Sequence, residues 1–202
     1  MITNFPNDLE KVVNNGFGYI KLSELAKTDL IRLLVSLEYN RVKDSEVECE
    51  SLYTVGTEML ANYNTVANTI IETLKDEVID LSEKLLGVET GSLEATYFIS
   101  KGTEGYNVPW HSDHQSDDSV FSVPIYLCEG KYSYESGMLE FALTEEVMSG
   151  NDRVIASMPA RSGYGAVIWS GDSKFSHRAT EVTVGTRYMI RFEIVKKSKK
   201  PA

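Results

Sequence analysis

Two histidines, one aspartate and one arginine are the side chains of this sequence whose types and spacing could do chemistry. His111 and Asp113 are two residues apart, and His177 lies ten residues before Arg187. Two imidazoles and one carboxylate can hold one face of a ferrous ion and leave its other positions open. An arginine ten residues after the second histidine can form a bidentate ion pair with the far carboxylate of an organic acid that chelates the same metal.

The chain has three histidines, and their positions indicate that His111 and His177 are candidate ligands and that His114 is not. His111 and Asp113 fall at the end of a predicted strand, where residues two apart point to the same face. His114 would then face away from Asp113, so we interpret it as a surface or entrance residue. Because a His-x-Asp pair is common by chance, the assignment of a metal site depends on His177 and on the surrounding sequence.

The first half of the chain has the apolar periodicity of helices that pack on a core. Leucines at near-helical spacing predict a helix over about residues 24–38, with Ser23 as its cap. A longer apolar stripe predicts a helix over about residues 58–86. A short strand pattern covers residues 16–22, and residues 39–56 are expected to form a charged loop.

After Gly91 the pattern changes to short β-rich runs that are separated by Gly, Asn, Asp and Pro. Such a series of short strands predicts a sandwich or jelly roll. The expected strands are residues 93–100, 121–127, 138–143, 153–157, 166–170, 181–184 and 187–195.

Helices followed by strands predict an α+β chain that forms a single domain over residues 1–202, with N-terminal helices packed on the major sheet. Residues 1–90 would be the mainly helical part, residues 91–195 the jelly-roll core, and residues 196–202 a solvated basic tail. The last strand supports this arrangement, because its side chains alternate. One set would be buried against the helices: Tyr188, Ile190, Phe192 and Ile194. The other would point into the barrel: Arg187, Met189 and Arg191.

The composition limits the partners that the protein can have. A net charge of −10 argues against non-specific binding to nucleic acid or to an anionic membrane. Cys49 and Cys128 lie far apart and in no metal-binding pattern, so we expect no disulfide framework and a reducing compartment. The sequence shows neither a signal-peptide pattern nor an apolar run long enough to span a membrane. We therefore expect a soluble, cytoplasmic protein.

Four motifs in order make residues 91–195 similar to the 2-oxoglutarate and Fe(II)-dependent dioxygenase superfamily, and most of all to its prolyl-4-hydroxylase-like branch. The first motif runs from Tyr97 to Asp113 and contains a glycine turn before His-x-Asp. The second is the strand over residues 121–127, and the third is the glycine-containing segment over residues 135–141. The fourth runs from His177 to Arg187.

This resemblance implies a double-stranded β-helix, which is a form of jelly roll, and an Fe(II) ion with His111, Asp113 and His177 as its ligands. It implies a reaction that couples decarboxylation of 2-oxoglutarate to succinate and CO2 with hydroxylation of a substrate by dioxygen. Ascorbate would be a supporting reductant. The substrate implied by the branch is a peptidyl proline.

The resemblance also implies residues that bind 2-oxoglutarate. Arg187 would pair with the 5-carboxylate, and the hydroxyl of Tyr126 would donate to the same group. Tyr97 is a candidate for a contact near the iron, although its offset from His111 is longer than this role requires. Each has a structural alternative: Arg187 as an ion-pair partner in the core, and the two tyrosines as packing residues.

Two other functions remain open from the sequence. The same scaffold could oxidise a free amino acid or another small molecule in place of a peptide. A jelly-roll binding module without catalysis would keep the fold, but it would have no use for three metal ligands and an arginine. Oxidation of a nucleobase is disfavoured, because the second half of the chain has no clustered basic groove.

Overall fold

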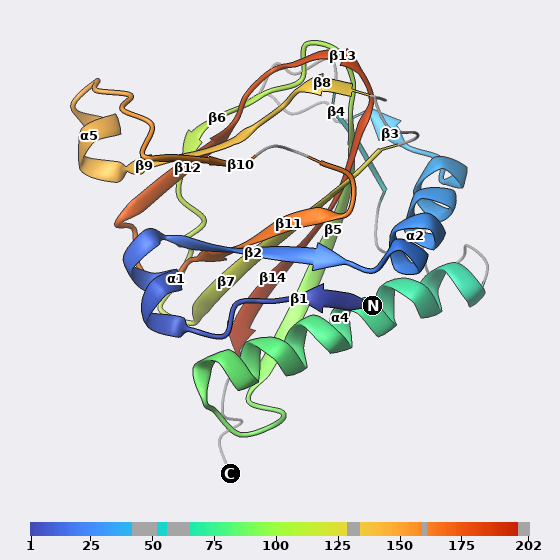
Figure 1. The fold of residues 1–202 in the computed structure, drawn as a ribbon, viewed down its shortest axis with the longest axis horizontal. Coiled ribbons are helices and arrows are strands. Elements are labelled where there is room, and N and C mark those ends of the chain that lie inside the picture. The colour runs from blue at the N-terminus through green and yellow to red at the C-terminus, as the bar shows by residue number, and fades with distance from the viewer. Residues whose placement is uncertain (42–51, 56–64, 129–133, 159–160, 198–202) are drawn as a thin grey trace.

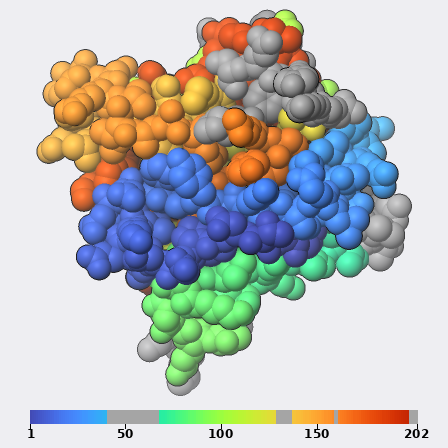
Figure 2. Space-filling model, viewed as in Figure 1, coloured from blue at the N-terminus to red at the C-terminus, as the bar shows by residue number. Residues whose placement is uncertain are grey.

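The computed structural model describes residues 1–41, 52–55, 65–128, 134–158 and 161–197. Within these residues, an eight-stranded sheet and a four-stranded sheet form the two layers of the molecule, and helices α2 and α4 lie against the outer face of the larger sheet (Figure 1). In the space-filling view the blue N-terminal segment lies directly above the green α4, and the amino group of Met1 forms an ion pair with Glu77 of that helix (Figure 2). This is the predicted α+β arrangement, with a jelly roll behind N-terminal helices.

The larger sheet has the strand order β1-β2-β11-β7-β14-β5-β4-β3, and its paired neighbours are antiparallel. Its strands are β1 (Ile2–Asn4), β2 (Phe17–Leu22), β3 (Asn40–Arg41), β4 (Leu52–Val55), β5 (Leu93–Gly102), β7 (Ser119–Leu127), β11 (Tyr164–Trp169) and β14 (Arg187–Lys196).

The smaller sheet has the order β10-β9-β12-β6, and a separate ribbon pairs β13 with β8. These strands are β6 (Val108–His111), β8 (Tyr134–Ser136), β9 (Leu139–Leu143), β10 (Ala156–Met158), β12 (Phe175–Ala179) and β13 (Val182–Gly185).

The described helices are α1 (Leu9–Asn15), α2 (Glu24–Ser36), α4 (Thr65–Leu86) and α5 (Thr144–Met148). Of these, α1 and α2 begin after a residue whose side chain caps the helix. The hydroxyl of Ser23 accepts a hydrogen bond from the backbone N–H of Ala26 at 3.2 Å, which satisfies one of the unpaired donors at the start of α2. Within the described residues, no helix is long and apolar enough to cross a bilayer.

The core between the helices and the larger sheet follows the alternation that the last strand predicts. Four side chains of β14 belong to this core cluster, together with Leu30 and Leu34 of α2 and Ile71 and Leu74 of α4. The four are Tyr188, Ile190, Phe192 and Ile194. Because a strand exposes alternate residues to opposite sides, the residues between them face the other way, toward the smaller sheet.

One expectation about the first half of the chain was wrong. The expected loop over residues 39–56 contains β3 and β4, and β4 pairs with β5 at the side of the larger sheet. The described part of residues 1–90 thus contributes four strands to the larger sheet besides its helices. Short edge strands are stabilised by pairing with a distant partner, which local sequence patterns do not contain.

Three other expectations fall partly on residues that the structure does not describe. The long helix is present from Thr65, whereas residues 58–64 and Cys49 lie outside the described parts of the chain. Cys128 is buried, as expected. Lys196 ends β14, and the backbone N–H of Lys197 donates to the carbonyl of Ser92, so the start of the basic tail is fixed to the fold.

A buried carboxylate connects the end of α4 to the start of β5. Glu83 is only 3% exposed, and its Oε1 accepts hydrogen bonds from the backbone N–H groups of Gly91 at 2.8 Å and Leu93 at 3.0 Å. Hydrogen bonds to a charged acceptor are stronger than neutral ones. This contact therefore fixes the turn through which the chain enters the jelly roll.

Replacing Glu83 by alanine should destabilise the protein by about 2 kcal/mol, because two backbone N–H groups, of which that of Leu93 is buried, would lose their charged acceptor. Urea unfolding followed by circular dichroism measures the change. The exposed Glu89→Ala variant, four residues before Leu93, is the matched control and should unfold like the wild type. Equal midpoints for both variants would show that the Glu83 contacts do not stabilise the fold.

Candidate metal centre

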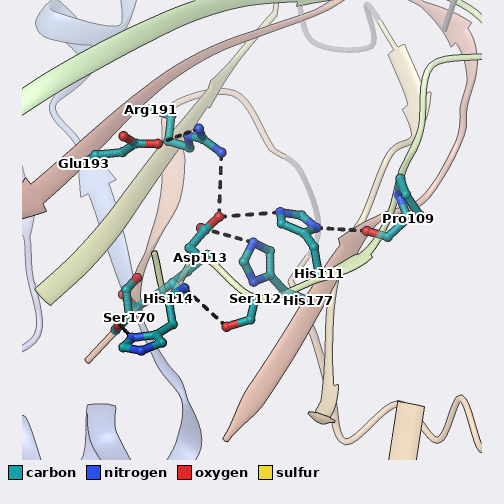
Figure 3. A network of polar contacts seen from close by, with 10 residues as sticks. Pro109, His111, Ser112, Asp113, His114, Ser170, His177, Arg191 and Glu193 are labelled. Atoms are coloured by element: carbon teal, nitrogen blue, oxygen red, sulfur yellow. Dashed lines mark hydrogen bonds and ion pairs between the residues drawn. The ribbon is translucent and has the colours of Figure 1, made fainter. Parts of the chain in front are cut away.

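Strand pairing in the smaller sheet brings the two ligand histidines together. His111 ends β6 and is the register partner of His177 in β12. Their imidazole rings are 4.3 Å apart between centroids. Asp113 follows two residues after His111, and its carboxylate points between the two rings (Figure 3). Two side chains that are close in sequence and a third that is distant thus converge on one point.

The distances among these side chains suit a bound ion. The Nε2 atom of His111 is 3.6 Å from Oδ1 of Asp113, and the Nε2 atom of His177 is 3.3 Å from Oδ2. One potential ligand atom from each residue lies within 4.8 Å of the others. Adjacent ligands of an ion bound at about 2.1 Å are separated by about 3 Å, so small side-chain shifts would complete the site.

The aspartate has an unused lone pair at this point. Oδ2 of Asp113 is buried and has no hydrogen-bond partner, since the approach of His177 lacks hydrogen-bond geometry. A buried oxygen without a partner is costly, and a metal ion would supply the missing interaction. Two imidazoles and one carboxylate around such an oxygen are the donor set of a ferrous facial triad.

The protonation states of the ligands also suit a metal. Burial and the neighbouring His177 lower the pKa of His111 below its ordinary value. Burial alone would raise the pKa of Asp113, but its contacts with His177 and Ser122 and the charge of Arg191 outweigh burial and hold it well below the usual range. At neutral pH, His111 is therefore neutral and Asp113 ionised, and these are the forms that bind a metal.

The backbone orients the first histidine. Nδ1 of His111 lies 2.9 Å from the carbonyl oxygen of Pro109. Because a carbonyl oxygen can only accept, the proton of the neutral ring is on Nδ1, and Nε2 is left with its lone pair toward Asp113. The backbone of β6 thus selects the tautomer that can coordinate a metal.

A cavity of about 380 Å³ opens between the two sheets and contains the metal-ligand group. Arg187 lines this cavity and is only 2% exposed. Its Nη1 donates to the carbonyl of Gly137 at 2.8 Å, and its guanidinium carbon lies 5.0 Å and 5.2 Å from the ring centroids of Tyr106 and Tyr126. The cavity therefore combines a candidate metal site with a separately anchored guanidinium.

The structure brings five of the six predicted site residues to this cavity. They are His111, Asp113, Tyr126, His177 and Arg187. Tyr97 is not among them, so its predicted contact near the iron is corrected. Its ring packs edge-on against Phe192 at 6.3 Å, on the helix side of the larger sheet. Alternation along β5 places the next residue, Phe98, at the cavity instead.

Two cavity residues had no assigned role in the sequence. Tyr106 flanks Arg187, and its only local signal was a position next to the turn glycine Gly105. Arg191 was expected to face the barrel interior, and it does, with Nη1 at 3.7 Å from Oδ1 of Asp113. His114 lies apart from the ligand group, and its Nδ1 is 2.9 Å from the carbonyl oxygen of Ser170.

Replacing His177 by alanine should weaken Mn(II) binding by more than about 100-fold, because loss of an outer partner of a metal ligand already costs 10–100-fold. Isothermal titration calorimetry under anaerobic conditions measures the affinity. His114→Ala is the matched control and should bind Mn(II) like the wild type, since His114 lies outside the ligand group. Undiminished binding by the His177 variant would contradict the ligand assignment.

Comparisons with known proteins find likeness in structure but not in sequence. No family model and no curated protein matches the chain by sequence. The structure is similar to that of a prolyl-4-hydroxylase from Pseudomonas putida, with a TM-score of 0.64, 16% identity and coverage of 94% of this chain and 97% of that one. It is similarly close to an oxidoreductase of the 2OG-Fe(II) oxygenase family from Burkholderia pseudomallei, with a TM-score of 0.63, 16% identity and coverage of 94% and 88%.

A third solved structure is an epimerase. It is the non-heme α-ketoglutarate-dependent SnoN of nogalamycin biosynthesis, with a TM-score of 0.62, 13% identity and coverage of 93% of this chain and 80% of that one. Each of the three matches covers 93% or 94% of this chain. The protein thus has the double-stranded β-helix fold of the 2-oxoglutarate and Fe(II)-dependent oxygenases.

Proposed function

We propose that this protein is an Fe(II)- and 2-oxoglutarate-dependent dioxygenase that couples decarboxylation of 2-oxoglutarate to succinate and CO2 with hydroxylation of a substrate. The observation that carries the proposal is the presence, in one cavity, of a two-histidine, one-carboxylate group and a buried arginine. Neither feature alone specifies this chemistry. Together they match the two ends of a keto-diacid, which would bind a metal through one end and a guanidinium through the other.

In this proposal the ferrous ion would be held by His111, Asp113 and His177, and with 2-oxoglutarate and dioxygen it would supply the oxidising chemistry. The protein would hold the reactants in place and exclude water. The ligand group is suited to this role because His177 is 5% exposed and its strand is paired on both sides. A site on paired strands keeps its geometry better than one on loops.

The environment of Arg187 supports a dianionic ligand. Among the residues that the structure describes, no carboxylate lies within ion-pair distance of this arginine, and its hydrogen bond to Gly137 is to a neutral carbonyl. A buried charge without a counter-charge is strongly unfavourable. The 5-carboxylate of 2-oxoglutarate would neutralise it and accept a pair of hydrogen bonds.

Tyr126 would add a hydrogen bond to the same carboxylate. It is 2% exposed and lies beside the guanidinium of Arg187. Burial raises the pKa of Tyr126 to about 12, although the charge of Arg187 opposes the rise. The phenol is therefore protonated at neutral pH and can donate to an anion. Tyr106, whose ring centroid lies 5.0 Å from the guanidinium carbon of Arg187, would add to the wall around that carboxylate.

The substrate could be a peptidyl proline, and the likeness to a prolyl-4-hydroxylase favours this candidate. The likeness to an epimerase of a biosynthetic pathway supports the alternative, a free amino acid or another small molecule on the same scaffold. Incubation with proline-containing peptides and, separately, with free amino acids distinguishes the two, because a hydroxylated product gains the mass of one oxygen atom.

A binding module with the same fold is the other class of function. The test is succinate formation from 2-oxoglutarate with Fe(II) and ascorbate in the absence of substrate. A dioxygenase should show slow, iron-dependent turnover that a chelator abolishes. A binding module should form no succinate above the background without protein, and that result would overturn the proposed function.

Replacing Arg187 by alanine should weaken 2-oxoglutarate binding by about 30-fold or more, because it removes a desolvated charge partner worth about 2–5 kcal/mol. Calorimetric titration of the anaerobic Mn(II)-loaded protein measures the affinity. The exposed Arg153→Ala variant is the control for loss of one positive charge. An unchanged affinity in the Arg187 variant would show that the cosubstrate does not bind where we propose.

A further inference from the structure

The cavity contains a second arginine that the proposed reaction does not use. Arg191 lies four residues after Arg187 on β14 and therefore faces the same side of the strand. It lines the same cavity, and its side chain is 27% exposed. Figure 3 shows its guanidinium directed toward the carboxylate of Asp113, on the side away from His177. The two arginines thus lie at different places relative to the metal ligands.

Most donors of Arg191 are unfilled. Nη2 donates to Oε1 of Glu193 at 2.6 Å, and Nη1 is 3.7 Å from Oδ1 of Asp113, which is too far for a hydrogen bond. Nε is buried and has no hydrogen-bond partner. A guanidinium offers five N–H groups, so this residue retains donors for a ligand. Glu193 does not line the cavity. Its ion pair with Arg191 therefore orients the guanidinium from outside the cavity.

The free donors of Arg191 point to an additional anion. With a divalent metal and 2-oxoglutarate bound, Asp113 would bind the metal, and the two carboxylates of the cosubstrate would bind the metal and Arg187. Arg191 would keep Glu193 as its counter-charge, and its remaining N–H groups would have no acceptor of their own among the described cavity residues. Besides Asp113, its surroundings include the ring of Phe98, whose centroid lies 5.8 Å from the guanidinium carbon. Free donors of a cation in partly apolar surroundings attract an anion.

We propose that Arg191 is the specificity-determining residue of this site and binds a carboxylate of the substrate, so that the enzyme acts on a small carboxylic acid. This inference rests on the proposed function and names its substrate class. A carboxylate at Arg191 would anchor the substrate beside the metal ligands, with its aliphatic part against the apolar wall that Phe98 and Met189 contribute. An internal proline of a peptide has no charge that Arg191 could recognise.

The test uses a pair of probes that differ in charge and little in shape, acetate and acetamide. The protein is loaded anaerobically with Mn(II) and saturating 2-oxoglutarate, which occupies Arg187. Paramagnetic relaxation of the carbon-13 signal of each labelled probe then reports its binding close to the metal. With wild-type protein, the carbon-13 relaxation rate of acetate should rise to a saturable maximum, and that of acetamide should stay at the background level. Arg191→Gln should weaken acetate binding by about tenfold or more, and Arg191→Lys should recover part of it.

Control measurements separate this role from the others that Arg191 could have. Affinities for Mn(II) and for 2-oxoglutarate are measured on the same variants, and the exposed Arg153→Gln serves as the charge control. The proposal requires both affinities to be unchanged in Arg191→Gln. A loss of Mn(II) affinity would show that Arg191 only positions Asp113, and a loss of 2-oxoglutarate affinity would show that it binds the cosubstrate. Either result overturns the proposal.

Two further outcomes would also overturn it. Acetate relaxation that is absent from the wild type, or equal in the wild type and Arg191→Gln, would show that Arg191 binds no substrate carboxylate. Failure of the proposed function is recognised separately, because in that case wild-type protein would bind neither Mn(II) nor 2-oxoglutarate before any probe is added.

Discussion

The pairing of β6 with β12 is the constraint on which the site depends. It sets His111 opposite His177, and with Asp113 two residues further on it gathers the three candidate ligands. A shift of one residue in this register would turn one histidine to the other face of the sheet. β9 prevents such a shift from the other side, because it pairs with β12 over five consecutive residues from Phe175 to Ala179. The placement of the two histidines is therefore a property of the smaller sheet, and Asp113 follows in the loop after β6.

One strand of the larger sheet, β14, supplies the arginines that would bind the organic ligands. β14 is hydrogen-bonded to β5 and β7 along most of its length, and it has one face in the core with the helices and one in the cavity. Arg187 and Arg191 are therefore rigidly spaced on the cavity face. Such preorganisation lowers the cost of ordering charged side chains when a ligand binds. The smaller sheet thus holds the two candidate ligand histidines, and the larger sheet holds the two arginines that would bind anions.

Alternation within a single strand was sufficient to predict the two faces of the last strand, with Arg187 on the face toward the cavity. The grouping of His111, Asp113 and His177 was expected from the resemblance to a known family, because it depends on the pairing of β6 with β12. Tyr97 was assigned to the wrong face because the choice between Tyr97 and Phe98 depends on how β5 pairs with its neighbours. β4 was missed for a related reason, since its partner β5 is distant in sequence. The unfilled donors of Arg191 and the absence of a counter-charge at Arg187 among the described residues are properties of packing, and no sequence pattern contains them.

The most direct measurement of the central claim is an anaerobic crystal structure of the protein with Fe(II) and 2-oxoglutarate. We predict anomalous density for iron within bonding distance of His111, Asp113 and His177, and one carboxylate of the cosubstrate against Arg187. Iron bound at any other place would contradict this account. So would a cosubstrate whose far carboxylate lies outside the cavity between the two sheets.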